Sequence, residues 1–361
     1  MSTGPALAPA SNIVDRVAAF VERFVFLKLK PIYRLVSLWI IATHLHQSFE
    51  YSGYLFIHSP DKQCGKTRLL EILDLLVLNS TGIDSSPTAA VVARTAWGNT
   101  QLLDEGDGWP DLPGLRNILN AGFQRNARTY RCQQDNLGSH KPQLLKIYCP
   151  RAIAGIGKDI LSGTTRDRTF IVEMARQKRE ERREELRGRM HQPQAAQLQF
   201  EIETWAKTHH DQVIAFYDSL VQHPLPYLRD FGDRTKDVSD PLGSILEIAY
   251  ANRPEELMRA RMELCDAIAH SREETNQYSD DHRLLTAIEA VIEGEELIEQ
   301  PSVLAHRLNG SAGSEFNEFA IGELLRRYGF PHKSVRKDGL PRKCYVIERS
   351  RLSDILTRYS S

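Results

Sequence analysis

The segment 54–79 constrains the fold most, because a short apolar run, a polar loop and a longer apolar run follow one another directly. YLFIH (54–58) has the composition of a buried strand, and KTRLLEILDLLVLN (66–79) that of a buried helix. Strand, loop and helix in this order form the first half of a βαβ unit. Further strand candidates lie at 100–105, 146–156 and 169–174. We therefore expect an α/β fold with a parallel sheet covered by helices.

The loop in this segment, SPDKQCGKT (59–67), ends in the GK[ST] pattern of phosphate-binding loops. Lys66 would reach the β- and γ-phosphate oxygens of ATP, and the Thr67 hydroxyl would bind Mg²⁺. Pro60 stands where that pattern has its first glycine, so the loop must begin with a different shape. The residues expected to bind the nucleotide are Pro60, Asp61, Lys62, Gln63, Cys64, Gly65, Lys66, Thr67 and Arg68.

Two adjacent carboxylates end the strand candidate at 100–105. In an ATPase with such a loop, Asp104 would hold Mg²⁺ and Glu105 would act as the general base on the attacking water. A small-molecule kinase needs only the first acid, so the pair favours hydrolysis and leaves kinase activity as a weaker hypothesis. Surface acids that cap a strand are the structural alternative.

Arg166 and Arg168 stand directly before the strand candidate at 169–174. In ring-forming ATPases this position supplies an arginine finger to the γ-phosphate held by the neighbouring subunit, and Arg168 is the stronger candidate. An ion pair within the chain, with Asp167 or Glu173, is the alternative. Two further candidates are weaker: Lys158 as a polar sensor, and Arg234 as a lid arginine that senses the γ-phosphate.

Composition and patterning predict four regions along the chain. They are a loose arm (1–11), an ATPase core with N-terminal helices divided by Pro31 (12–176), a helical lid or linker (177–300) and a basic winged-helix-like module (301–361). The charge run 176–189 is expected to be a solvated helix face. No strand is expected between this run and about residue 343.

The formal net charge of the chain is −1, so any nucleic-acid surface must be local. Nine Lys and Arg residues stand against two acids between Arg326 and Arg351. DNA is therefore an expected partner of the last region, and packing against the acidic segment 293–299, expected to be a helix, is the alternative. The residues expected to contact DNA phosphates are Arg326, Arg327, Lys333, Arg336, Lys337, Arg342 and Lys343.

A second basic patch, QRNARTYR (124–131), follows the acid pair. Arg125, Arg128 and Arg131, together with Tyr130, would suit a single strand in the pore of a ring. An exposed turn and a contact between subunits are the alternatives.

Other features exclude whole classes of protein. MSTGPALAPASN lacks the basic and apolar regions of a signal peptide, and the apolar stretch 35–43 is too short to cross a bilayer. The five cysteines show no C-x-x-C spacing, which argues against a disulfide framework or a structural zinc site. We expect a cytoplasmic protein with reduced thiols and no membrane partner.

The motifs SPDKQCGKT, LLDEGD, RAIAGIGK and TRDRTFIVEM resemble the domain of unknown function 3631, a P-loop, AAA+-like ATPase family of phages, plasmids and mobile elements. The resemblance extends over about residues 13–359, and Pro60 is shared with the family's own loop. The C-terminal segment departs from it, because CYVIE replaces a Gly-Tyr pair. The resemblance implies a role in replication or maintenance of a mobile element. The loop, the acid pair and the arginines before residue 169 indicate a homo-oligomeric ring, with a hexamer as one such ring.

Together these features predict a ring-forming, Mg²⁺-dependent ATPase that couples hydrolysis to DNA remodelling or translocation. The second hypothesis is an ATP-gated DNA-binding switch or loader. It would recruit a replicative or mobile-element protein and would use slow hydrolysis only to reset itself.

Overall fold

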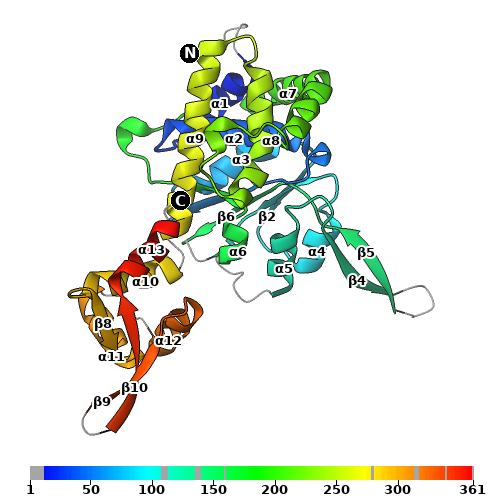
Figure 1. Ribbon diagram of the computed structural model, residues 1–361. Helices are drawn as coiled ribbons and strands as arrows, with labels where there is room; N and C mark the ends of the chain where they lie inside the picture. Colours follow the sequence, from blue (N-terminus) through cyan, green and yellow to red (C-terminus); the bar gives the residue numbers. More distant parts are fainter. Residues whose placement is uncertain are drawn as a thin grey trace. The chain divides into compact units, whose positions relative to one another are not determined.

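The computed structural model describes residues 12–106, 113–134, 140–157, 160–277, 280–312, 317–337 and 340–359. Contacts between residues divide the chain into two compact units, 1–272 and 273–361 (Figure 1). The first unit contains the sheet and the long helices, and the second contains a smaller sheet with short helices.

A five-stranded parallel sheet forms the centre of the first unit, in the order β2-β3-β6-β1-β7. Its strands are β1 (Tyr54–Ser59), β2 (Ser80–Asp84), β3 (Thr100–Leu103), β6 (Arg151–Ile156) and β7 (Thr169–Glu173). All six residues of β1 are buried, and Leu55 lies beside Ala152 of β6 and Phe170 of β7. The expected α/β fold with a parallel sheet is confirmed. The candidate at 146–156 is a strand only from Arg151, after Pro150, which has no N–H to give to the sheet.

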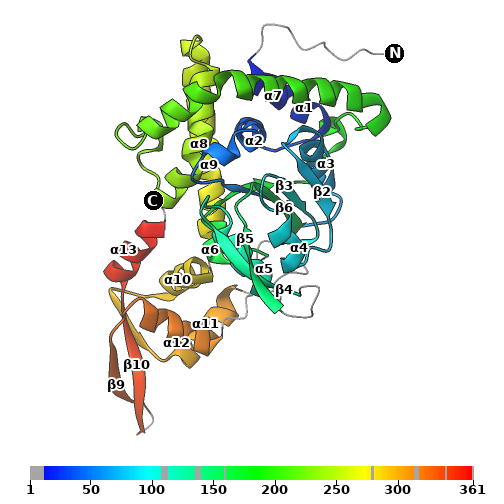
Figure 2. The same cartoon turned by 90° about the vertical axis from the view of Figure 1, so that its right-hand side faces the viewer.

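Helices cover both faces of this sheet, with α1, α2 and α3 on one side and α4, α5 and α6 on the other (Figures 1 and 2). Their bounds are α1 (Ile13–Phe24), α2 (Lys30–Thr43), α3 (Lys66–Leu76), α4 (Ala89–Arg94), α5 (Pro113–Ala121) and α6 (Gly163–Arg166). Pro31 lies in the first turn of α2, where a missing N–H costs nothing, and α1 already ends at Phe24. The two expected N-terminal helices are therefore present, with Pro31 inside the second.

Of the three long helices that follow, the first two and most of the third belong to the same unit. They are α7 (Gly188–Ser219), α8 (Asp233–Ala249) and α9 (Pro254–Gln277). α7 contacts α3, and α8 contacts α2, so these helices pack around the core helices. The contact division falls inside α9, after Arg272, whereas the sequence predicted boundaries after 176 and 300.

The charge run 176–189 is not a helix, which corrects the expectation. It contains only a short 3₁₀ turn, η3 (Arg179–Glu181), before α7 begins. Arg23 of α1 donates from Nε to the Glu184 carboxylate at 2.6 Å, and the Glu184 N–H donates to the Arg23 carbonyl at 3.1 Å. His191 Nε2 lies 3.0 Å from the same carboxylate. These contacts bind the run to α1 as an extended segment.

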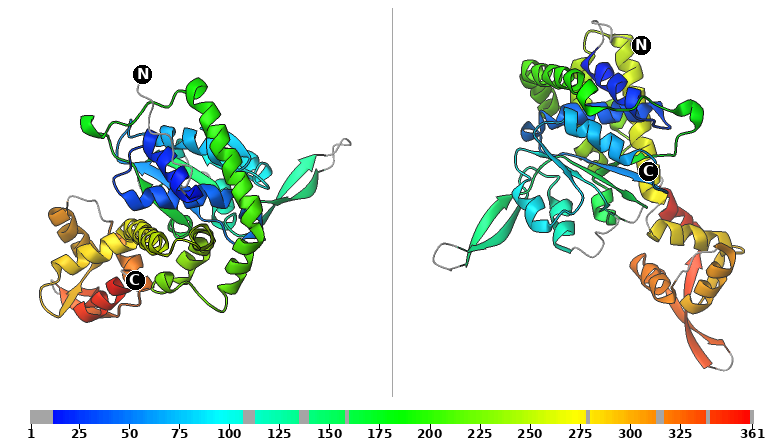
Figure 3. Two further views of the ribbon diagram at one scale, coloured as in Figure 1. Left: turned by 90° about the horizontal axis from the view of Figure 1, so that it is seen from above. Right: turned by 180° about the vertical axis from the view of Figure 1, so that it is seen from behind.

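An antiparallel hairpin of β4 (Arg128–Gln134) and β5 (His140–Lys146) extends away from the parallel sheet (Figures 1 and 3). Arg128 pairs with Lys146, and Tyr130 pairs with Leu144. The basic patch at 124–131 thus forms the base of a hairpin that the sequence did not predict.

The second unit contains a three-stranded antiparallel sheet in the order β8-β10-β9. Its elements are α10 (Asp280–Val291), β8 (Glu296–Glu299), α11 (Pro301–Ala312), α12 (Glu318–Arg327), β9 (His332–Lys337), β10 (Leu340–Glu348) and α13 (Arg349–Tyr359). Leu285, Leu304, Leu325 and Ile347 lie in its buried core.

Two sequence expectations for this unit are wrong. Residues 296–299 form strand β8 rather than part of an acidic helix, because they pair with 345–348 of β10. Strands therefore reappear well before residue 343, and β9 begins at His332. The cross-strand pairs outweigh the helical propensity of the glutamates in EGEELIE.

All five cysteines have free thiols. No helix in the described part of the chain has both the length and the apolar character needed to cross a bilayer.

A buried arginine joins three strands where β1 and β6 begin. Arg151 is fully buried and donates to Gln101 Oε1, to the Tyr54 hydroxyl and to the Ile147 carbonyl, each at 2.8 Å. Gly122 lies directly against it. A Cβ atom at Gly122 would lie 2.4 Å from Arg151 Nη1 and 2.7 Å from the Ile147 carbonyl oxygen.

We expect Gly122→Ala to lower the free energy of unfolding by about 2 kcal/mol, because neither the Ile147 backbone nor the buried Arg151 guanidinium can move away from the added methyl group. Gly163→Ala is the matched control, since nothing lies within 4 Å of its Cβ position. Urea unfolding followed by intrinsic fluorescence measures both. Equal midpoints for the two variants would contradict this packing.

Candidate nucleotide site

The loop between β1 and α3 has the local conformation that a phosphate cradle requires. Gln63 and Gly65 have left-handed φ values of 62° and 90°, and Gly65 is the N-cap of α3. The first N–H groups of a helix have no partner within it, and they point out of its N-terminus. These donors and the helix dipole favour an anion at this loop.

Lys66 folds back over the loop instead of extending into solvent. Its Nζ donates to Ser59 Oγ at 2.6 Å and to the Asp61 carbonyl at 3.4 Å. Both acceptors are neutral, so a phosphate oxygen can replace them with a gain in charge attraction. Ser59 Oγ in turn donates to the Asp61 carbonyl at 2.5 Å. Ser59 is a site residue that the sequence reasoning did not single out.

Other residues of the loop differ in exposure and in contacts. Pro60, Asp61, Lys62, Gln63 and Thr67 are exposed, and Cys64 is buried. Arg68 points elsewhere: it donates to the Leu186 carbonyl at 2.8 Å and pairs with Glu71 at 3.1 Å. The structure therefore does not bring the Arg68 side chain to the loop.

The acid pair lies at the same edge of the sheet as the loop. Asp104 directly follows β3, and its N–H donates to the Asp84 carbonyl at 2.9 Å. Its carboxylate accepts from the Glu105 N–H at 2.8 Å, and Glu105 is exposed with a left-handed φ of 54°. Since only β6 separates β1 from β3, the two strand ends are about 10 Å apart.

The chain leaves β1 and its neighbour β6 in opposite directions across the sheet. After β1 it crosses to β2, and after β6 it crosses to β7 at the other side. Ligands of parallel sheets bind at the carboxyl ends of strands where such connections diverge. The loop, Lys66 and Asp104 thus lie at the topologically favoured position.

The finger candidates lie at the opposite edge. The Tyr54 N–H, at the start of β1, donates to the Arg168 carbonyl at 3.0 Å. Arg166 is only 5% exposed, whereas Arg168 is half-buried, with its guanidinium 4.6 Å from the ring centroid of Phe123. Glu173, one expected partner for these arginines, lies 3.5 Å from Lys28.

Arg234 lies in the first turn of α8 with its guanidinium over the same Phe123 ring, at 5.3 Å. The structure therefore brings Arg168 and Arg234 together and places neither beside the loop of the same chain. Phe123 carried no signal in the sequence, because a lone buried aromatic is common in any core. Lys158, the sensor candidate, falls outside the described residues.

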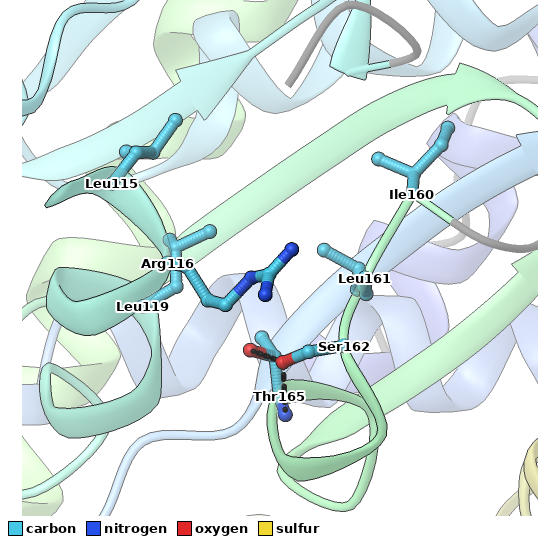
Figure 4. Close-up of a pocket in the computed structure, with 7 residues that line it drawn as sticks. All are labelled: Leu115, Arg116, Leu119, Ile160, Leu161, Ser162 and Thr165. Carbon is cyan, nitrogen blue, oxygen red and sulfur yellow. Dashed lines mark hydrogen bonds between the residues drawn. The ribbon is translucent and has the colours of Figure 1, made fainter. Parts of the chain in front are cut away.

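A small pocket on the first unit lies between α5 and the turn that leads into α6 (Figure 4). It is lined by Leu115, Arg116, Leu119, Ile160, Leu161, Ser162 and Thr165. Its volume of about 20 Å³ is the space of a single water molecule. This pocket cannot hold a nucleotide.

The expected nucleic-acid residues fall into two separate groups. In the first unit, Arg125 and Arg128 are exposed, as is Tyr130, whereas Arg131 is half-buried. In the second unit, the described cations are exposed: Arg326, Arg327, Lys333, Arg336, Arg342 and Lys343. The side chain of Lys337 is outside the described part of the chain.

Comparison with known proteins places the chain in a family. The family described as "Protein of unknown function (DUF3631)" matches residues 173–359, more than half of the chain. The chain therefore belongs to this family. The matched region begins in β7 and does not include the loop at 59–67.

Two solved structures of the NrS-1 C-terminal region (305–718), both without ligand, resemble the chain. The A form is 14% identical, with a TM-score of 0.37, and covers 93% of this chain and 74% of its own. The other is 16% identical, with a TM-score of 0.40, and covers 93% and 75%. No curated protein matches.

Helix α8 also carries two carboxyl groups whose pKa values are raised, those of Asp237 and Asp240. Burial, followed by the charge of Asp237, raises the pKa of Asp240 from its ordinary 3.8 to about 6. Burial likewise raises the pKa of Asp237, against the lowering effect of Arg234. The folded protein thus binds more protons than the unfolded chain between about pH 4 and pH 6.

The free energy of unfolding should therefore fall as pH rises through this window. Asp240→Asn should remove the part of this fall that is due to Asp240. We expect this variant to gain about 1 kcal/mol over wild type near pH 7.5, after allowance for solvent screening, and almost nothing near pH 4. Thermal unfolding at both pH values measures the gain, with the exposed Asp218→Asn as the control. A gain independent of pH would contradict the assignment.

Proposed function

We propose that this protein is a Mg²⁺-dependent ATPase that holds ATP in the loop 59–67 and hydrolyses it with the acid pair after β3. The observation that carries the proposal is Lys66 Nζ, which is folded over the loop and, among the described residues, donates to the neutral Ser59 Oγ and Asp61 carbonyl, on the sheet edge where Asp104 also lies. A lysine and a helix N-terminus facing one space make a site for a polyphosphate.

The residues present fit Mg²⁺ as well. Mg²⁺ binds through one or two protein oxygens plus substrate phosphates, not through a cage of protein ligands. The described residues contain no group of three or more His, Cys, Asp or Glu side chains that could hold a metal ion, so the Thr67 hydroxyl and the Asp104 carboxylate are the two protein oxygens that we assign to Mg²⁺. When bound there, the ion would neutralise charge on the phosphate oxygens.

The chain's own groups would share the work of hydrolysis. Lys66 would hold the β- and γ-phosphate oxygens, and the loop N–H groups would orient them. Glu105 would accept the proton of the attacking water, because its exposed carboxylate is not tied to a cation among the described ion pairs. Glu105 has a left-handed backbone conformation, which is strained for a residue with a side chain and is frequent at active sites.

Completion of the site would require a second copy of the chain. The six residues of β1 span about 17 Å between the Arg168 edge and the loop edge, beyond the reach of one arginine side chain. We therefore propose a homo-oligomeric ring in which Arg168 serves the nucleotide of the neighbouring subunit.

DNA is the proposed partner of the second unit, which we interpret as a winged helix. Helix α12 precedes the β9–β10 hairpin, as a recognition helix precedes its wing. The strand register places Arg336 and Lys343 on one face of that hairpin, and Lys333 and Arg342 on the other. A wing with cations on both faces can contact phosphates on either side of a groove.

The family resemblance extends this proposal to replication or maintenance of a mobile element, with remodelling or translocation on DNA as the output. An ATP-gated DNA switch or loader is the second candidate. The chain divides into one unit with the loop and another with the basic hairpin, and this division supports both candidates equally. In the second candidate, the nucleotide state would control DNA binding without any translocation. The stimulation of hydrolysis by DNA distinguishes the two.

We expect Lys66→Ala to abolish ATP binding, and Glu105→Gln to retain binding while lowering kcat at least about 100-fold. Equilibrium titration with Mg²⁺–ATP and steady-state phosphate release measure the two effects. Lys207→Ala on the outer face of α7, paired with Glu203 at 2.6 Å, is the control and should change neither. Wild-type turnover in Lys66→Ala would exclude the loop as the site.

We expect Arg336→Ala/Lys343→Ala to weaken DNA binding and to reduce the slope of log Kd against log salt by about 2, because two phosphate contacts are lost. Lys333→Ala/Arg342→Ala, on the other wing face, should do the same. Fluorescence anisotropy with a short duplex and a single strand measures the slopes. The control is Arg283→Ala, because Arg283 is exposed on α10 and should not change the slope. If both hairpin variants had the wild-type slope, the β9–β10 hairpin would be excluded from the DNA interface.

A further inference from the structure

We propose that Ser59 is a positioning residue of the nucleotide site. Its hydroxyl accepts one N–H of the Lys66 ammonium and so directs the other two at adjacent phosphates of the ligand. The inference rests on the proposed ATPase function, and it gives a role to a residue that the GK[ST] pattern does not contain.

Ser59 is held in place by its backbone. It is the last residue of β1, is fully buried, and lies beside Ile156 of β6. Its carbonyl accepts from the Gly157 N–H at 3.2 Å. Pro60 follows it, and a residue that precedes a proline is confined to extended conformations. The Ser59 side chain therefore leaves the sheet from a fixed point.

The Ser59 hydroxyl is oriented as an acceptor for Lys66. Its Oγ donates to the Asp61 carbonyl at 2.5 Å, so its one proton is committed and its lone pairs remain for the lysine. Lys66 Nζ lies 2.6 Å from Ser59 Oγ but 3.4 Å from the Asp61 carbonyl oxygen. The bond to Ser59 is therefore the stronger of the two.

The number of donors determines what Lys66 can offer to a ligand. An ammonium group has three N–H groups and no acceptor. Ser59 takes one of them, and a phosphate oxygen can replace the long bond to the Asp61 carbonyl with a gain in charge attraction. Two N–H groups then face the ligand, one for each of two adjacent phosphates. This arrangement fits a nucleoside diphosphate or triphosphate.

The contact also bears on affinity. A lysine side chain has more rotamer freedom than most others, and fixing it costs conformational entropy. Ser59 holds Lys66 beside the helix N-terminus of α3 in the structure itself, so that this cost does not fall on the binding step. The Ser59 hydroxyl should therefore tighten the binding of polyphosphate through Lys66, without touching the ligand.

The contact can be tested without nucleotide, by limited acetylation of the chain and mass spectrometry. Ser59→Ala should raise the rate of Lys66 modification about tenfold, the factor for one hydrogen bond to a charged group. Ser59→Cys, which keeps the volume but offers only a weak sulfur acceptor, should behave in the same way. Ser59→Thr keeps the hydroxyl and should match wild type. Lys207, exposed on α7, is the internal control and should react equally in every variant.

Nucleotide affinity should follow the same order. The Kd values for Mg²⁺–ATP and for ADP should rise about tenfold in Ser59→Ala and in Ser59→Cys, but not in Ser59→Thr. Ser244→Ala is the matched control, because Ser244 is also fully buried and also donates to a backbone carbonyl, that of Asp240. It should change neither the Kd nor the reactivity of Lys66. Thermal unfolding of each variant checks the fold.

The opposite results would overturn the proposal. Equal rates of Lys66 modification in wild type and Ser59→Ala would exclude the contact, and an unchanged Kd in Ser59→Ala would exclude its effect on binding. A Ser59→Thr variant with wild-type thermal stability but the weak binding of Ser59→Ala would assign the effect to packing, as would a Ser59→Cys variant that binds like wild type. A wild type that binds no Mg²⁺–ATP would refute the proposed ATPase itself. The modification rates do not depend on nucleotide, so they distinguish the two failures.

Discussion

The parallel pairing of β1 with β6 and β7 is the constraint on which the rest of this structure depends. Because all six residues of β1 are buried between β6 and β7, with helices on both faces of the sheet, a shift in its register would displace every packed side chain of the strand. The strand therefore fixes what lies at its two ends. One end carries the loop with Lys66, and the other carries Phe123 with its two arginines. The length of one buried strand thus separates the candidate loop site from the two arginines.

This separation is the reason for which we propose self-association. The loop edge carries Lys66 and the acid pair, and the opposite edge carries the guanidiniums of Arg168 and Arg234. In the proposed head-to-tail arrangement, the arginine edge of one copy would meet the loop edge of the next. The buried Arg151 supports the arginine edge from inside, because it ties β6 to β3 through Gln101 and to β1 through Tyr54, and a third hydrogen bond goes to the Ile147 carbonyl.

Much of this core could be predicted from the sequence, because the patterns involved are local. An apolar strand, a loop ending in Gly65-Lys66-Thr67 and an apolar helix specify one another over about twenty-five residues. Strand order, the β4–β5 hairpin and the position of Arg234 depend on long-range packing, and no local pattern encodes them. The charge run failed as a helix for the same reason, since Arg23 holds Glu184 from 161 positions away. Strand β8 was missed because its glutamates favour a helix until β10 supplies a partner.

The most direct test of this account is a crystal or cryo-EM structure of the wild-type chain with Mg²⁺ and a non-hydrolysable ATP analogue. The account predicts the β- and γ-phosphates against Lys66, Thr67 and Asp104 as the protein ligands of the metal, and Arg168 of a neighbouring copy on the γ-phosphate. A nucleotide bound away from the loop, or one whose γ-phosphate meets only residues of its own chain in a complete oligomer, would contradict it.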